Sequence, residues 1–267
     1  MRFRFKIMPF LACVGFLPVG SSLVGPAYAE QIRISSEYSI SFAGIPVARS
    51  KFKTVIDGAA LTVTGNLATS GLAAVFDSTK ATSTSSGIIS KNGVETQSFK
   101  LDYKSGSRAR VTEISFSGGN VVDTVITPTR APKPDDVPLQ PGQLNGVVDP
   151  FFASIVAAPN AKAVCNRTLK VFDGVTRINL VMRPSGSEPY VIGSTKGEGV
   201  RCAVRYEPVA GHRANSGSVR YLSDGERATI IFGRLAGTDL YAPVKATIKT
   251  KNGTVTVRAI KFDQTVN

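Results

Sequence analysis

The sequence offers few residues that could perform nucleophilic or metal-dependent catalysis. His212 is the only histidine among the 267 residues. Ser-His and Cys-His nucleophile pairs in their usual form are therefore excluded, as is a metal centre built from several histidines. Gly211 and Arg213 flank His212 and place it in a predicted loop. We expect no catalytic residue, no metal ion and no cofactor.

The acidic residues leave one catalytic alternative open. Hydrolysis of a glycan needs two carboxylates at a set separation in space, which spacing along the chain cannot reveal. Most acidic residues fall in predicted turns or beside the excess of lysine and arginine, where they serve as turn formers or solvated ion-pair partners. The alternative function is therefore an envelope glycan or peptide hydrolase that uses paired carboxylates. Its candidate acids are Asp102, Glu113, Asp173, Glu188, Glu198 and Glu207.

Two of the three cysteines are candidates for a disulfide. Cys165 and Cys202 lie in the second half of the chain, whereas Cys13 lies in an apolar stretch near the N-terminus. A metal pair or a redox pair is less favoured, because there is no Cys-x-x-Cys and almost no histidine to complete a site. In an oxidising compartment an even cysteine count predicts a structural disulfide. Closing this loop corresponds to at most roughly 4 kcal/mol in the chain-entropy model.

The first residues have the pattern of an export signal. A basic start, Met1 to Lys6, precedes the apolar stretch Ile7 to Val24, and Ala27-Tyr28-Ala29 fits the small-x-small pattern of a signal peptidase site. We predict that residues 1–29 are a signal peptide cleaved after Ala29 and that the protein works in a bacterial periplasm. The alternative, an uncleaved membrane anchor, is weakened by two prolines inside a run that is already marginal for a span.

Cleavage would change the composition of the chain only slightly. It would remove Cys13 and lower the formal net charge of +13 by three, because two arginines and one lysine lie in the signal. The mature protein would remain basic. Residues 30–267 are long enough for one hydrophobic core, and their composition is that of a folded protein.

The mature chain has an all-β pattern. Short runs rich in Val, Ile, Thr, Tyr and Phe alternate with polar residues, as in Tyr38 to Phe42, and glycine turns separate them. Asn or Asp beside Gly supplies the positive φ angles of tight hairpin turns. We predict a mainly β fold with a long antiparallel, strongly curved sheet, an open barrel or spiral. The turn signals are Asp57-Gly58, Asn92-Gly93, Gly118-Gly119-Asn120, Asp173-Gly174, Asp224-Gly225 and Asn252-Gly253.

Three segments interrupt the strand pattern. Ser70 to Phe76 is rich in Ala and Leu and predicts a short helix. Asp149 to Ala157 predicts a second helix, with Asp149 as its cap and Pro150 in its first turn, which we expect to plug the core. The proline-rich stretch 128–141 cannot pair as a central strand and predicts an extended connection. We expect one domain, residues 30–267, in which a single sheet wraps around the second helix.

The basic residues are spread along the predicted strands rather than gathered beside aromatic residues. Lys245, Lys249 and Lys251 share one face of a strand, and Arg201 and Arg205 flank Cys202. With no tryptophan and no aromatic ladder beside these charges, nucleic acid is not an expected partner. Anionic lipid head groups are an expected partner, through peripheral contact with a membrane surface.

Several short motifs give the chain a resemblance to a known family. They are Val148-Asp149-Pro150, Cys165-Asn166, Val171-Phe172-Asp173-Gly174, Gly199-Val200-Arg201-Cys202 and Tyr206-Glu207-Pro208-Val209-Ala210-Gly211. With them the chain resembles a proteobacterial family of periplasmic proteins with a domain of unknown function. Such proteins look similar to envelope-integrity proteins built as a β-spiral around a helix, and more distantly to periplasmic lipoprotein carriers. The resemblance implies a cavity rather than a catalyst.

Together these observations predict a non-enzymatic periplasmic protein that supports cell-envelope integrity. It would bind a lipidic ligand, or an envelope protein such as a lipoprotein, on the concave side of the curled sheet. Four apolar residues are expected to face that concavity, although packing in the core is the simpler interpretation of them. A purely structural scaffold with a filled core is a further alternative. The four residues are Phe151, Phe152, Ile155 and Val156.

Overall fold

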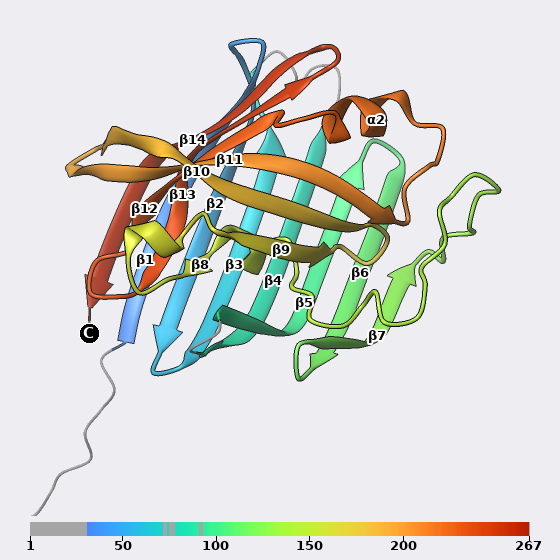
Figure 1. The fold of residues 1–267 in the computed structure, drawn as a ribbon, viewed down its shortest axis with the longest axis horizontal. Helices are drawn as coiled ribbons and strands as arrows, with labels where there is room; N and C mark the ends of the chain where they lie inside the picture. The colour runs from blue at the N-terminus through green and yellow to red at the C-terminus, as the bar shows by residue number, and fades with distance from the viewer. Residues whose placement is uncertain (1–30, 72–73, 75–77, 91–92, 267) are drawn as a thin grey trace, which may run out of the picture.

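The computed structural model describes residues 31–71, 74, 78–90 and 93–266. The predicted signal peptide and its cleavage after Ala29 lie outside these residues. Most of the described chain is strand, in agreement with the expected β pattern (Figure 1). The strands are β1 (Gln31–Phe42), β2 (Ile45–Asp57), β3 (Ala60–Thr69), β4 (Thr79–Ser90), β5 (Gly93–Ser105), β6 (Arg108–Ser117), β7 (Asn120–Thr127), β8 (Val156–Ala157), β9 (Arg167–Phe172), β10 (Arg177–Ile192), β11 (Thr195–Ala210), β12 (Ala228–Arg234), β13 (Leu240–Thr250) and β14 (Gly253–Val266).

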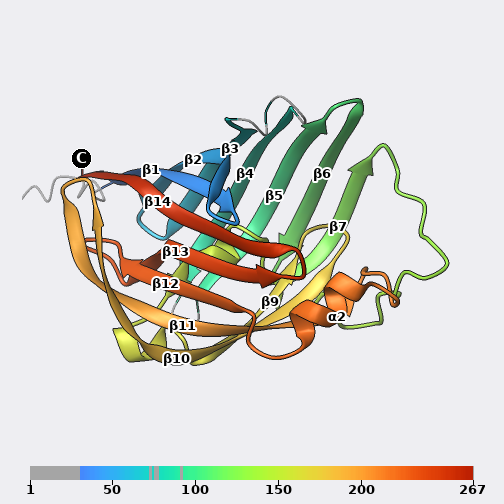
Figure 2. The same ribbon diagram turned by 90° about the horizontal axis from the view of Figure 1, so that it is seen from above.

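All of these strands belong to one antiparallel sheet. Its order is β7-β6-β5-β4-β3-β2-β1-β14-β13-β12-β11-β10-β9, and β8 pairs with β13. The first and last strands, β1 and β14, pair along almost their whole length and join the two halves of the chain. Seen from above, the sheet curls so that β9 to β13 face β2 to β6 across an interior (Figure 2). The predicted long, strongly curved antiparallel sheet is confirmed.

The glycine turns connect neighbouring strands where the sequence predicted them, with one exception. Gly58, Gly118 and Gly174 have positive φ angles in the turns after β2, β6 and β9. Of the pair Asn92-Gly93, only Gly93 lies within the described residues, as the first residue of β5. Asp224-Gly225 does not join two strands, because it follows a helix. This helix, α2 (Gly217–Ser223), begins at Ser216, whose side chain accepts a hydrogen bond from the Val219 N–H.

The two edges of the sheet are bridged at one place by the segment 144–148. On one side the Leu144 C=O accepts from the Val121 N–H of β7, and the Val147 N–H donates to the Gly119 C=O. On the other side Val148 exchanges hydrogen bonds with Lys170 and Phe172 of β9. The segment therefore satisfies backbone groups of both edges that the open sheet leaves without a neighbouring strand.

The helix predicted over Asp149 to Ala157 is much shorter than expected. Only one 3-10 turn forms, Phe152–Ser154, and the backbone is extended again at Ile155. The chain then pairs with β13, where Val156 lies opposite Tyr241. Pairing with the sheet satisfies the backbone groups that a longer helix would have satisfied internally. The prediction that this segment lies inside the curled sheet is correct, as Figure 1 shows.

Two other segments were predicted to interrupt the strands, and the structure describes only the second of them in full. The helix expected over Ser70 to Phe76 falls largely outside the described residues. The proline-rich stretch 128–141, all of which the structure describes, forms no strand and has one isolated bridge, between Asp136 and Arg213. No helix of the described residues is long and apolar enough to cross a membrane.

Cys165 and Cys202 form a disulfide, as the sequence predicted. Their Cα atoms are 5.3 Å apart and their sequence separation is 37. Both residues are fully buried in a cluster with Met182, Val204 and Phe232. The bond therefore fastens the loop before β9 to the middle of β11.

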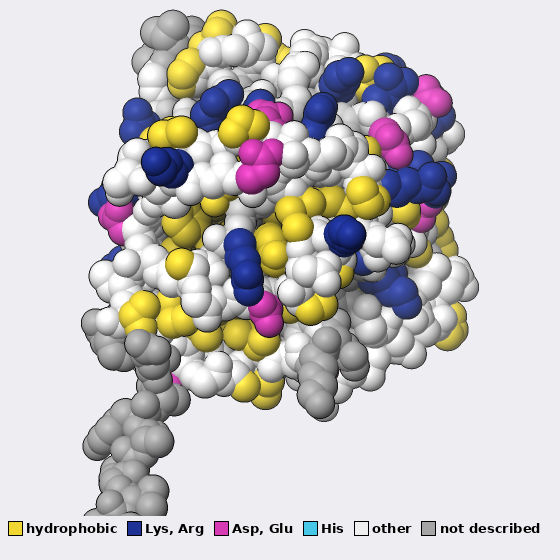
Figure 3. All heavy atoms as spheres, turned by 60° about the vertical axis from the view of Figure 1, so that its left-hand side comes forward, with side chains coloured by type: hydrophobic (Ala, Val, Ile, Leu, Met, Phe, Trp, Pro, Cys, Tyr) yellow, Lys and Arg dark blue, Asp and Glu magenta, His cyan; other side chains and the backbone are white. Residues whose placement is uncertain are grey.

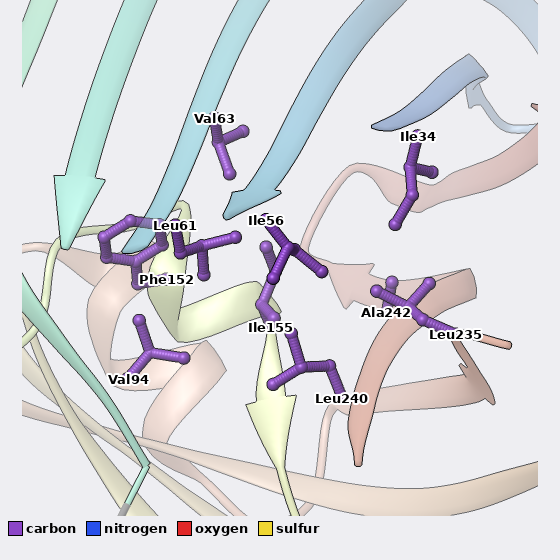
Figure 4. Packing of buried hydrophobic residues seen from close by; sticks show 10 residues of the cluster. All are labelled: Ile34, Ile56, Leu61, Val63, Val94, Phe152, Ile155, Leu235, Leu240 and Ala242. Carbon is purple, nitrogen blue, oxygen red and sulfur yellow. The ribbon is translucent and has the colours of Figure 1, made fainter. Parts of the chain in front are cut away.

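The segment inside the sheet completes a second buried cluster. Phe152 packs beside Leu61 of β3, and Ile155 packs beside Ile56 of β2 (Figure 4). Leu240 and Ala242 of β13 close the cluster from the opposite side of the interior. Both halves of the chain thus contribute to one core around residues 152–155.

Candidate ligand-binding cavity

A cavity of about 310 Å³ lies beside this core, on the concave side of the sheet. Strands β1, β2 and β3 form one wall, β13 and β14 form another, and the segment 150–155 forms the floor. Residues on alternate positions of each strand face the cavity, because side chains alternate between the two faces of a sheet. The volume is at the lower end of the range for pockets that hold small ligands.

An aromatic row separates the cavity from the rest of the interior. Tyr38 and Phe52 meet edge to face with ring centroids 5.7 Å apart, and Phe52 meets Phe151 in the same way at 5.5 Å. Phe151 in turn meets Phe99 of β5 at 5.8 Å. Gly65 makes room for this row, because a Cβ there would lie 2.6 Å from the Phe52 ring. The row gives the cavity a rigid apolar wall.

None of the described residues that line the cavity has a charged side chain. Its lining is aliphatic, aromatic, proline, serine and threonine. Tyr38 donates a hydrogen bond from its hydroxyl to the Pro243 C=O at 3.0 Å, and burial raises the pKa of Tyr38 to about 12. Tyr38 therefore stays neutral at any physiological pH. The lining residues are Ile34, Ser36, Tyr38, Ile40, Ser50, Phe52, Thr54, Val63, Leu67, Pro150, Phe151, Ser154, Ile155, Leu235, Ala242, Pro243, Val257 and Phe262.

Two hydroxyl groups in the lining have no partner among the residues that the structure describes. Ser50 and Thr54 of β2 are buried to 4% and 8% relative exposure and face the cavity. Neither side chain makes a hydrogen bond to any described residue. Neither hydroxyl oxygen is wholly enclosed by protein, so each is open to an atom that enters the cavity. The cavity therefore favours an occupant that is apolar along most of its length and offers a polar atom to β2.

Asp149 fixes the floor of the cavity. It is fully buried, and its carboxylate accepts hydrogen bonds from the Ser85 and Thr96 hydroxyls, each at 2.8 Å. The backbone N–H groups of Phe151 and Phe152 also donate to it. Burial raises the pKa of the Asp149 carboxyl, against the lowering effect of these donors. Asp149 thus has the capping role that the sequence predicted, and it positions Phe151 in the wall.

The four apolar residues expected to face the concavity divide into two pairs. Phe151 and Ile155 line the cavity. Phe152 does not, because it packs in the cluster with Leu61. Val156 does not either, because it packs in the cluster around the disulfide. The sequence could not separate the pairs, since both have the same residue types and the single turn at 152–154 decides their directions.

The candidate acids of the hydrolase alternative lie apart from the cavity, and most lie on the surface. Glu113 pairs with Lys100, Glu188 with Lys245, and Glu207 with Arg205. Asp102 faces a polar hollow on the outside of β3, β4 and β5. Asp173 binds backbone N–H groups of its own turn, and Glu198 is exposed. His212 lies in a bend and accepts a backbone hydrogen bond from Val137.

Sequence comparison places the chain among known families. The model of the family DUF3108, described as proteins of unknown function, matches residues 37–260. The chain belongs to this family. The match runs from β1 to β14 and therefore includes every strand of the cavity wall. The description of DUF3108 assigns no activity, and no curated protein matches the chain in sequence.

Two solved structures show a distant likeness to this DUF3108 member. A beta-barrel-like protein of the domain of unknown function DUF1849 from Brucella abortus is 9% identical with a TM-score of 0.44; the match covers 88% of this chain and 98% of that one. A hypothetical protein from Chlamydia trachomatis is 12% identical with a TM-score of 0.24, covering 85% and 86% of the two chains.

Proposed function

We propose that this protein is a non-enzymatic periplasmic protein that supports the cell envelope by holding one apolar chain of a lipidic ligand in its cavity. The uncharged lining of the cavity, with two hydroxyls that lack partners, carries the proposal. The disulfide is compatible with an oxidising compartment. A lipoprotein acyl chain and a free lipid present the same chemistry to the cavity.

The size of the cavity limits how much of a lipid it holds. A water molecule occupies about 30 Å³ in the liquid, and a methylene group is of similar size. A volume of about 310 Å³ therefore accommodates on the order of ten such groups. This fits an apolar segment of one acyl chain and leaves a charged head group outside, because a charge inside would have no partner.

The alternatives have less support in this geometry. A hydrolase would need two carboxylates facing a shared concave site, and the lining residues within the described part of the chain include none. A purely structural scaffold would have its interior filled, whereas the sheet leaves space between the two halves of the chain. Binding of an envelope protein remains compatible if that protein carries the acyl chain.

Lipid recovery tests the proposal. The full chain is expressed, recovered from the periplasm without detergent, and extracted for mass spectrometry of lipids. We expect a bound lipid with an acyl chain at near-stoichiometric amount, and a rise in Tm when fatty acid is added to delipidated protein. Absence of any copurified lipid together with no thermal shift would contradict the proposal.

A further inference from the structure

A row of cations crosses the convex face of the same strands that wall the cavity. The strand registers place Lys245 opposite Arg258, Arg258 opposite Ser39, and Ser39 opposite Arg49. On the next strands, Arg49 lies opposite Ala68, Ala68 lies opposite Lys80, and Lys80 lies opposite Lys104. It thus crosses seven neighbouring strands, which spans roughly 29 Å at about 4.8 Å per strand. The basic row is defined as Lys245, Arg258, Arg49, Lys80 and Lys104.

The basic row is poorly neutralised. Within the described chain, Arg49, Lys80, Lys104 and Arg258 form no ion pair, and all four are exposed. Lys245 pairs with Glu188, whose carboxylate lies 2.9 Å away. The pKa of Glu188 is lowered first by its hydrogen bond to Lys245 and, to a smaller extent, by the nearby charge of Arg258. Two pairs of like charges lie directly opposite each other in the sheet, an arrangement that costs stability. Folding does not explain such a row, whereas an external anionic surface would.

An exposed apolar turn lies at the same end of the sheet. Between β1 and β2 the chain turns at Ala43 and Gly44, and this turn presents Phe42 and Ile45 at 37% and 60% exposure. The Phe42 ring lies against Gly253, so the β1–β2 turn and the β13–β14 turn are adjacent. Figure 1 shows both turns projecting together at the top of the molecule. Lys251 is an exposed cation of the second turn.

The two features together match a membrane interface rather than a polyanion in solution. Anionic head groups attract lysine and arginine, and apolar side chains enter the boundary of the acyl region. Figure 3 shows Lys and Arg side chains spread over the adjoining face, with fewer Asp and Glu among them. Nucleic acid would instead favour aromatic side chains for stacking beside the cations.

We infer that the basic row and the β1–β2 turn dock this protein onto a bilayer of anionic phospholipid. Ile40, Leu67 and Val257 line the cavity. In the chain they are next to Ser39, Ala68 and Arg258, respectively, which lie on the line of paired residues that forms the basic row. Docking would therefore place the lipid surface on the opposite side of the sheet from this end of the cavity. The inference does not depend on the cavity being occupied.

Vesicle binding tests the inference with matched variants. The full chain recovered from the periplasm is floated with vesicles of phosphatidylglycerol mixed into phosphatidylcholine, and with pure phosphatidylcholine. The test variant is Arg49→Ser, Lys80→Ser, Lys104→Ser. The control, Lys162→Ser, Lys170→Ser, Lys196→Ser, removes the same charge from exposed residues outside the row.

We expect the test variant to lose partitioning onto anionic vesicles by on the order of 100-fold, at about fivefold per cation. The control should lose far less, and 1 M salt should abolish the difference. Ile45→Ser should weaken binding severalfold with all cations present. The inference would be overturned if the test and control variants lost binding equally, or if the natural chain bound neutral and anionic vesicles equally well. Tighter binding to an oligonucleotide than to anionic vesicles would also overturn it.

A cavity variant keeps this test separate from the proposed function. Ser50→Leu fills the cavity without changing the convex face, so it should bind anionic vesicles as the natural chain does. If Ser50→Leu lost vesicle binding as fully as the test variant, docking would depend on the cavity and the basic row would not be the docking surface.

Discussion

Gly87 lies in β4 where no side chain has room. A Cβ there would be 2.3 Å from the Glu95 C=O and 2.5 Å from the Phe152 ring. We expect Gly87→Ala to lower the free energy of unfolding by about 1–3 kcal/mol or more, because the turn that carries Phe152 must move. Urea denaturation measures this. Thr84→Ala, on the exposed face of the same strand, is the control, and an equally stable Gly87→Ala would contradict the packing described.

Asp149 makes the stability of the floor depend on pH. Its pKa is raised in the folded protein, so the folded state binds the proton more tightly than the unfolded state. The contribution of this group to stability is therefore largest at acidic pH and declines as pH rises from the unfolded value, about 3.9, through the folded pKa. We expect the natural chain to lose stability relative to Asp149→Asn between pH 4 and pH 7.

Urea denaturation of both chains at the two pH values checks this expectation. Asp149→Ala is a further variant that should be much less stable at both, because Ser85, Thr96 and two backbone N–H groups lose their acceptor. A gap between the natural chain and Asp149→Asn that widens in favour of the natural chain as pH rises would refute the raised pKa.

Residue types predicted some local roles and missed others. Asp149 before Pro150 identified a cap, and the two later cysteines identified the disulfide. The uncommitted hydroxyls of Ser50 and Thr54 could not be predicted, because serine and threonine alternate with apolar residues on many strands of this chain. Only the register of β2 against β1 and β3 shows that these two face the cavity.

At the scale of the strands, the pairing of β4 with β5 contains a test of the basic row. Lys80 and Lys104 lie directly opposite each other. We expect Lys104→Gln to raise the free energy of unfolding by about 0.2–1 kcal/mol, because it removes this repulsion. Lys100→Gln, on the same strand, instead breaks the pair with Glu113 and should leave stability unchanged or lower. If both variants behaved alike, the two lysines would not repel.

The disulfide stabilises the link between β11 and the loop before β9. With a separation of 37 residues, its loss in Cys165→Ala, Cys202→Ala should lower the free energy of unfolding by up to roughly 4 kcal/mol. Thermal unfolding with and without reductant measures this. The double variant should not respond to reductant, and a natural chain that also failed to respond would show that the thiols are not bonded.

Element types were easier to predict than their lengths. The helix expected over Asp149 to Ala157 stops after one turn, because β13 offers its backbone to Val156 and Ala157. That pairing is between residues far apart in the chain, which a local pattern does not contain. The helix α2 was missed for the opposite reason, since seven residues with few apolar positions give no periodic signal.

At the scale of the whole molecule, the sequence predicted one curled sheet but not which face does what. The pairing of β1 with β14 makes the two ends of the chain neighbours and brings Ile34 near Leu235 and Ala242. The same curl gives a concave side with an uncharged cavity and a convex side with the basic row. Neither feature is local in sequence, because each draws single residues from many strands.

Binding of a fluorescent fatty acid to delipidated protein is the measurement that tests the cavity most directly. We predict saturable binding of one molecule per chain to the natural protein and to Ser35→Leu, which makes the same change on the convex face of β1. Ser50→Leu should reduce affinity at least tenfold, because the added side chain takes up cavity volume and removes a free hydroxyl. Equal affinity in all three chains would contradict the account.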